Sequence, residues 1–289
     1  MKNLHTYRWL IPVASYALLG VLIVSAPMLA QVWLPQNSED FSLKIEVGES
    51  TGSGFLVGDT SELYLVTARH VLFEDSLARA LKAATATING YSAGEPYSLT
   101  FDLVALRRDG ELKADTAHDV AVIRWAEFLR GTPTRIITHR DYVRHNDDRK
   151  PTYGVVKWTD LRKYEQVQVG SDVYVFGYPT SIGLKRIPQI DYDRPLLQKG
   201  IVAGLNPAKK TIVLNVAANF GNSGGPAVEV EDGPTGPQFV AIGVVTEYIP
   251  FEEVQLNVSR NWVYSTISSS PYSIAEPLDP VIDIIRSWK

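Results

Sequence analysis

Residues Asn219–Val228, NFGNSGGPAV, place Ser223 among glycines and close to a proline, just after an apolar stretch. Glycine loses more conformational freedom on folding than any other residue, so a cluster of glycines needs a reason in the backbone. One reason is an ordinary tight loop. The other is a loop whose backbone N–H groups point at a ligand. The rest of the chain decides between the two.

A serine hydroxyl is a weak nucleophile unless a base lies within hydrogen-bond reach and a third group orients that base. Histidine titrates near neutral pH and is the usual base. His70 ends the apolar run Leu63–His70 (LYLVTARH), which would hold its ring at one place on a sheet rim. His5 precedes an apolar segment, and His139 and His145 lie in a polar stretch where solvated side chains are expected. His70 is the candidate base, although a lone histidine in such a place is more often structural.

The orienting acid has to be nearly buried and aimed at the imidazole. Asp119 directly precedes the apolar run Val120–Ile123, so it would open a core strand. An aspartate in that place is ordinarily a capping or turn residue. His70, Asp119 and Ser223 nevertheless follow in this order, each at the edge of an apolar strand. The three residues together predict catalysis by an activated serine.

Short apolar runs separated by Gly, Asn, Asp and Pro dominate the chain from Phe41 onward, which is typical of an all-β protein rather than of βαβ units. Two helices are predicted, one over Phe73–Ala86 and one over Pro280–Trp288, whose apolar residues share a face. The polar region Arg130–Gln168 lacks a pattern and predicts a long connection between two halves.

Six stretches follow one another in a recognisable order: Thr51–Val57 (TGSGFLV), Leu65–Val71 (LVTARHV), His118–Ile123 (HDVAVI), Val175–Pro179 (VFGYP), Gln198–Val202 (QKGIV) and Gly221–Pro226 (GNSGGP). With these stretches the chain resembles the trypsin-like serine proteases of the chymotrypsin fold, and most their HtrA/Deg and glutamyl-endopeptidase branches. The resemblance covers Phe41–Trp288.

The resemblance implies two packed six-stranded antiparallel β barrels, about 41–130 and 169–270, joined by a connection over about 130–168. A C-terminal helix over about 280–288 would end the protease domain, 41–289, and no PDZ domain would follow. The implied enzyme is a serine endopeptidase that forms an acyl-enzyme. His70 would be the general base, Asp119 its orienting acid and Ser223 the nucleophile. The backbone N–H groups of Gly221 and Ser223 would form the oxyanion hole, which answers why glycines surround the serine.

The resemblance also implies a substrate-binding strand and pocket. An extended peptide would pair with the strand at Gly243–Thr246. No acid lies just before Ser223, so a preference for Lys or Arg at P1 is not expected, and a pocket of Ala and Val with Thr246 favours small or medium apolar P1 side chains. The pocket residues are expected to be Ala217, Ala218, Gly243, Val244, Val245 and Thr246.

Two positions depart from the family pattern. Asn222 stands where the digestive enzymes have an aspartate that pairs with a newly cut N-terminus, so no zymogen switch of that kind is expected. Arg69 stands where the family often has a small residue, and the sequence offers no account of it.

The N-terminus predicts a location. Residues 1–9 carry Lys2 and Arg8, and the uncharged segment Leu10–Ala30 would span roughly 30 Å as a helix, about the thickness of a bilayer core. Positive charge before the segment favours a cytoplasmic N-terminus and an extracytoplasmic protease domain after a spacer over 31–40. An uncleaved anchor and a cleaved signal peptide both remain open, and both deliver the domain to the same side.

Composition excludes several other classes. The net charge of −4 gives no basic field for nucleic acid. The chain has no cysteine, which rules out disulfides, thiolate metal sites and a cysteine nucleophile, and no cofactor or metal is expected. Two hypotheses other than a constitutive protease stay open. One is a non-catalytic or partner-gated module that keeps only the substrate groove, and the other is a membrane scaffold that recruits a partner through the connection at 130–168.

Overall fold

The computed structural model describes residues 38–128, 136–138, 142–147, 151–180, 186–233, 236–257, 259–260 and 262–289. The segment 10–30, predicted to be an anchor or signal peptide, lies outside these residues. Among the residues described, no helix is both long and apolar enough to cross a membrane.

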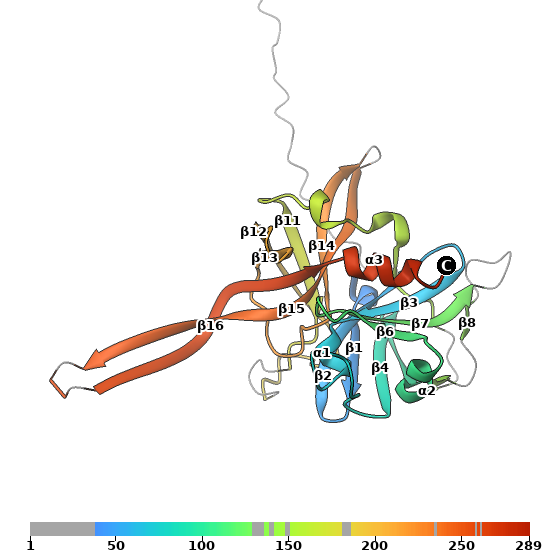
Figure 1. Ribbon diagram of the computed structural model, residues 1–289, viewed down its shortest axis with the longest axis horizontal. Helices are drawn as coiled ribbons and strands as arrows, with labels where there is room; N and C mark the ends of the chain where they lie inside the picture. Colours follow the sequence, from blue (N-terminus) through green and yellow to red (C-terminus); the bar gives the residue numbers. More distant parts are fainter. Residues whose placement is uncertain are drawn as a thin grey trace, which may run out of the picture. The chain divides into compact units, whose positions relative to one another are not determined.

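The first half of the chain forms a ten-stranded sheet in the order β6-β7-β3-β2-β1-β4-β5-β9, with β8 added to β7 and β10 added parallel to β2 (Figure 1). Its core lies between the strands and includes Leu65, Phe101 and Trp125. The strands are β1 (Leu43–Val47), β2 (Ser50–Gly58), β3 (Glu62–Thr67), β4 (Thr85–Ser92), β5 (Glu95–Asp102), β6 (Leu112–Ala114), β7 (Ala121–Phe128), β8 (Ile136–Thr138), β9 (Val143–His145) and β10 (Val155–Lys157).

The second half closes into an antiparallel barrel in the order β11-β12-β13-β16-β15-β14. Its core is aliphatic, with Val175, Val240 and Ile242 fully buried. The strands are β11 (Asp172–Gly177), β12 (Leu196–Asn206), β13 (Thr211–Asn215), β14 (Pro226–Gly233), β15 (Gly236–Asn257) and β16 (Trp262–Pro277). β15 and β16 continue beyond the barrel as a two-stranded ribbon (Figure 1).

The predicted fold class, all-β with two barrel-like sheets and a C-terminal helix, is confirmed. The first sheet, however, has ten strands rather than six. Seven of them, β1 to β7, lie within the range predicted for the first barrel, and β8, β9 and β10 come from the region predicted to be a patternless connection. The α-helices are α1 (Arg69–Leu72), α2 (Leu103–Arg108) and α3 (Asp279–Arg286), and the 3-10 helices are η1 (Ser38–Phe41), η3 (Trp158–Asp160) and η4 (Tyr164–Gln166).

The helix predicted over Phe73–Ala86 is wrong. The carboxylate of Asp75 accepts hydrogen bonds from the backbone N–H groups of Leu77, Arg79 and Ala80, and so folds the segment into a turn. Aspartate competes in this way with helical backbone bonds. Phe73 then pairs with Leu81 across the turn, and β4 begins at Thr85.

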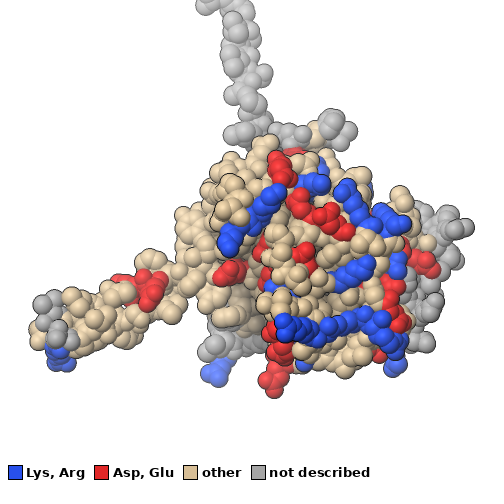
Figure 2. Space-filling model, viewed as in Figure 1, with Lys and Arg blue, Asp and Glu red and all other residues tan. Residues whose placement is uncertain are grey.

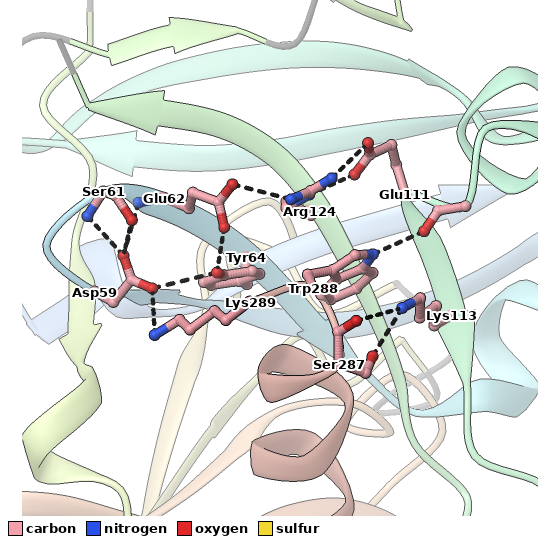
Figure 3. Close-up of polar contacts among 11 residues, drawn as sticks. Asp59, Ser61, Glu62, Tyr64, Glu111, Lys113, Arg124, Ser287, Trp288 and Lys289 are labelled. Carbon is pink, nitrogen blue, oxygen red and sulfur yellow. Dashed lines mark hydrogen bonds and ion pairs between the residues drawn. The ribbon is translucent and has the colours of Figure 1, made fainter.

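The C-terminal helix α3 fastens the end of the chain to the first sheet (Figure 3). Trp288, just after the helix, stacks on Tyr64 of β3 at 5.8 Å and donates its indole N–H to the Gly110 carbonyl at 2.8 Å. Lys289 pairs with Asp59 at 2.9 Å. The apolar side of α3 packs on residues of β2, β3, β7 and β15, so the helix closes the core shared by the two sheets.

Candidate active site

His70 and Asp119 meet at one end of the antiparallel pair β3 and β7. The register places Thr67 opposite Ala121, so the residues just beyond these strand ends come together. His70 lies in the single turn of α1, and its Nδ1 is 2.5 Å from Oδ2 of Asp119. The backbone N–H of His70 donates to Oδ1 of the same carboxylate at 3.0 Å. Two contacts therefore fix the ring, and Nε2 is the nitrogen that faces away from the acid.

The environment keeps Asp119 ionised at neutral pH. Burial alone would raise the pKa of Asp119, but the hydrogen bond and charge of His70 together with the charge of Arg69 outweigh burial and lower the pKa. Because the folded-state pKa lies below the unfolded value near 3.9, this carboxylate stabilises the fold above that pH. The stabilisation is lost as the pH falls through the folded-state pKa.

Arg69 now has a structural role. Its side chain is almost buried, and Nη1 donates to the carbonyls of Asp115 and His118, both at 2.8 Å. Nη2 lies 3.6 Å from Oδ1 of Asp119, and the backbone N–H of Arg69 donates to the Asp119 carbonyl at 3.2 Å. The guanidinium thus holds the loop that carries the acid, which a small residue at this position could not do.

Ser223 lies in the turn before β14, in the same cavity as His70. Its Oγ donates to the backbone carbonyl of Thr246 at 3.3 Å. Proton transfer to His70 therefore requires the hydroxyl to turn from this carbonyl to the ring. Catalytic hydrogen bonds are often long or misaligned without substrate, so this geometry is compatible with a nucleophile.

The loop before Ser223 is shaped to expose backbone donors. The Asn222 N–H donates to the Asn219 carbonyl at 2.9 Å, which closes a turn with Gly221 at φ +99°. The Phe220 carbonyl accepts hydrogen bonds from N–H and Oγ1 of Thr180 at 2.8 and 3.2 Å. In a trans peptide the C=O and the next N–H point in opposite directions. The Gly221 N–H therefore points away from Thr180 and takes no part in the contact between Thr180 and Phe220.

Ser53 of β2 joins the first sheet to this loop. Its backbone N–H donates to the Ser223 carbonyl at 2.7 Å, and its Oγ donates to the Gly221 carbonyl at 2.6 Å. The Tyr178 N–H in turn donates to Ser53 Oγ at 3.0 Å. The loop is thus tied to both halves of the molecule. Asn222 is buried beside Gly177, and as a neutral amide it forms no ion pair.

Alanine at Gly221 is expected to lower kcat about 10²–10³-fold, the usual effect of losing one oxyanion donor. The added Cβ would lie 2.1 Å from the Tyr178 carbonyl oxygen, and φ +99° is strained for any residue with a side chain. Peptidase kinetics measure the loss. Gly204→Ala is the matched control, because a Cβ there meets nothing within 4 Å. Equal activity of the two variants would contradict the role of Gly221.

A cavity of about 420 Å³ contains the candidate residues. Of the predicted residues, His70, Ala218, Gly221, Ser223, Val245 and Thr246 line it. Asp119, Ala217, Gly243 and Val244 do not line it. Asp119 instead contacts His70, and Val244 packs in the core between the sheets.

Sequence reasoning missed several residues of the cavity, chiefly Lys82, Phe220, Glu247 and Tyr248. Phe220 and Tyr248 contact each other edge to face, with ring centroids 5.4 Å apart. The position of Tyr248 two residues after Thr246 on the expected substrate strand could have indicated it. Nothing local indicates Lys82, which comes from the turn of the first sheet that was predicted to be helical.

Comparisons with known proteins find a family model and several solved structures that resemble the chain. A family model described as a trypsin-like peptidase domain matches residues 52–235, more than half of the chain. Comparison with curated proteins finds no match. Among solved structures, Deg5 is 19% identical with a TM-score of 0.47, over 86% of this chain and 88% of that one. The HtrA-type protease AlgW with a tripeptide is 17% identical with a TM-score of 0.46, over 88% and 63%. Human heparin binding protein is 10% identical with a TM-score of 0.48, over 88% and 92%.

Proposed function

The chain belongs to the family of trypsin-like peptidase domains and is a serine endopeptidase, and we propose that Ser223, His70 and Asp119 carry out its chemistry. His70 Nε2 takes the proton of Ser223 Oγ as the oxygen attacks the peptide carbonyl carbon. The oxyanion accepts hydrogen bonds from the N–H groups of Gly221 and Ser223. Protonated His70 then gives its proton to the leaving amine, and an acyl-enzyme remains.

Water completes the cycle through the same groups. His70 takes a proton from water, the hydroxide attacks the ester carbonyl, and the proton returns to Ser223 Oγ as the acid product leaves. Asp119 keeps its charge throughout and stabilises the imidazolium. The observation that carries this proposal is the double contact of Asp119 with His70, at 2.5 Å to Nδ1 and 3.0 Å from the backbone N–H.

Hydrolysis of fluorescein-labelled casein by the full-length chain tests the proposed activity. We expect release of labelled peptides at a rate proportional to the concentration of the chain. A preparation of Ser223→Ala is expected to release none above background. Equal release by both preparations would assign the activity to a contaminating protease and contradict the proposal.

The contact between Phe220 and Tyr248 supports a preference for small P1 side chains, because the two rings occupy space in the cavity beside Ser223. Tyr248→Gly is expected to raise kcat/KM for a P1 phenylalanine peptide about tenfold relative to its P1 alanine counterpart, the scale of a change in pocket size. The ratio is measured with matched chromogenic peptides. Tyr272→Gly, an exposed tyrosine of the same hairpin, serves as control. An unchanged ratio in Tyr248→Gly would contradict the proposal that Tyr248 limits the size of the P1 side chain.

We also propose that the peptidase acts outside the cytoplasm, anchored or delivered by residues 10–30. The charge of Lys2 and Arg8 before the uncharged segment supports this orientation. Proteinase K added to intact spheroplasts of a bacterial host is expected to degrade the peptidase domain and to spare a cytoplasmic marker. Protection of the domain until lysis would contradict the proposed location.

A partner-gated peptidase is the second candidate. The observation that favours it is the hydrogen bond of Ser223 Oγ to Thr246 rather than to His70. A ligand that displaced this bond would switch the serine on. The partner-gated candidate predicts that the folded chain has no peptidase activity alone and becomes active when an activating peptide is added.

A further inference from the structure

The ribbon formed by β15 and β16 leaves the barrel as an arm, here residues 250–269. Its register runs from Pro250↔Ser269 to Asn257↔Trp262. The neighbouring strands do not follow it, since β14 pairs with β15 only as far as Val244 and β13 pairs with β16 only from Ser273. Within the residues described, no strand pairs with either outer edge of the arm. An isolated two-stranded hairpin is marginally stable in water.

The two faces of the arm differ in chemistry. Side chains alternate along a strand and paired residues share a face. One face, here the aliphatic face, carries Val254, Leu256, Val263 and Ile267, exposed by 61, 64, 64 and 67%. The other face carries Phe251, Trp262 and Tyr264 among polar side chains. The aliphatic face therefore presents an apolar stripe to solvent, with Ser265 beside Val254 and Glu252 at its barrel end.

The distribution of charged side chains along the arm indicates which kind of partner it binds. Charged side chains are sparse along the arm (Figure 2). Glu252 and Glu253 lie at its barrel end, Arg260 lies at its tip, and the strand from Trp262 to Ser269 has no charge. A single cation does not suit an anionic membrane surface or nucleic acid, which several basic residues recognise. Opposite charges at opposite ends suit a second arm that runs the other way.

We propose that this arm joins two copies of the chain, with the aliphatic faces packed together and the arms antiparallel across a two-fold axis. Such an interface is self-complementary, as two-fold contacts require. Arg260 of one copy then lies near Glu252 of the other, which is on the aliphatic face. Four aliphatic side chains per copy make a small interface, of the size that weak complexes use, so the dimer is expected to dissociate in the micromolar range or above.

Single cysteines test the geometry in the full-length chain, which has no cysteine of its own. Leu256→Cys lies on the aliphatic face, midway along the strand between Glu252 and Arg260 and so at the proposed two-fold axis, and Gln255→Cys is its neighbour on the opposite face. Under mild oxidation we expect a disulfide-linked dimer from Leu256→Cys and little from Gln255→Cys. Equal cross-linking of both positions, or of neither, would overturn the proposal.

Sedimentation velocity of the full-length chain between 0.5 and 50 µM measures the dissociation constant of the dimer, which is expected to lie in about this range for so small an interface. We expect concentration-dependent dimers, and the Leu256→Ser/Ile267→Ser double variant is expected to raise the dissociation constant at least about tenfold. Phe251→Ser, on the opposite face, and Val169→Ser, exposed away from the arm, are controls expected to leave it unchanged. Circular dichroism shows whether each variant is folded.

A charge exchange separates the proposed partner from other occupants. Arg260→Glu is expected to weaken the dimer, and adding Glu252→Arg in the same chain is expected to restore it, because each copy then presents the reversed pair. A monomer at all concentrations, or arm variants that alter only binding to phosphatidylglycerol vesicles or to unfolded casein, would overturn the dimer. Peptidase activity is measured in parallel and is expected to persist, so failure here leaves the proposed function standing.

Discussion

Alanine at Ser223 or at His70 is expected to lower kcat about 10⁶-fold, and the double variant no further. Removing either residue removes the same step, since the hydroxyl attacks only as its proton passes to the ring. The remaining rate, about 10³–10⁴-fold above the uncatalysed reaction, would come from the oxyanion donors and from substrate binding. Steady-state hydrolysis of a chromogenic peptide measures kcat for each variant, since no acyl-enzyme can form without Ser223.

His145 provides the control for His70, because it is an exposed histidine at the end of β9. His145→Ala is expected to keep full activity. Additive losses in the double variant Ser223→Ala/His70→Ala would show that the two residues do not act as a unit. Such a result would contradict the proposed mechanism even if each single variant were impaired.

Asparagine at Asp119 is expected to lower kcat about 10⁴-fold with little effect on KM. The side chain keeps its shape but loses the charge that stabilises protonated His70, and its amide can turn an N–H toward Nδ1, which favours the wrong tautomer. The lowered pKa of Asp119 means that the native carboxylate supplies this charge at neutral pH. Steady-state kinetics with a peptide substrate measure both constants.

Asp172→Asn is the matched control, because Asp172 is a surface carboxylate paired with Lys199 at 2.6 Å. It is expected to leave kcat unchanged. A loss of less than about tenfold in Asp119→Asn would show that another group orients His70. His118 and Glu276, paired with each other at 2.7 Å near the same loop, would then be examined first.

Local sequence could indicate the functional residues that lie directly next to an apolar strand. His70 after β3, Asp119 before β7 and Ser223 before β14 all have this character, and the structure brings His70 and Ser223 into one cavity and Asp119 against His70. The glycine cluster by itself left a tight loop and a loop with exposed donors both open, and only the family resemblance favoured the second. The spacing of the apolar residues was sufficient to predict the C-terminal helix, whose apolar face contacts both sheets.

Long-range contacts were beyond such reasoning. Ser53 lies 168 positions from Gly221, whose carbonyl it binds, and Thr180 lies 40 positions from Phe220. The role of Arg69 depends on carbonyls that become neighbours only after β3 and β7 pair. The helix predicted over Phe73–Ala86 failed for a local reason, because Asp75 offered the backbone a competing set of hydrogen bonds. The arm was missed because its strands read as ordinary continuations of the barrel.

Labelling with a fluorophosphonate probe tests the central claim most directly, because the probe bonds only to a serine activated by its surroundings. The full-length chain is treated with the probe, and intact mass spectrometry followed by peptide mapping locates the adduct. We expect one adduct on Ser223, absent from Ser223→Ala and from His70→Ala. A folded native chain without an adduct on Ser223, or an adduct that persists in His70→Ala, would contradict the claim.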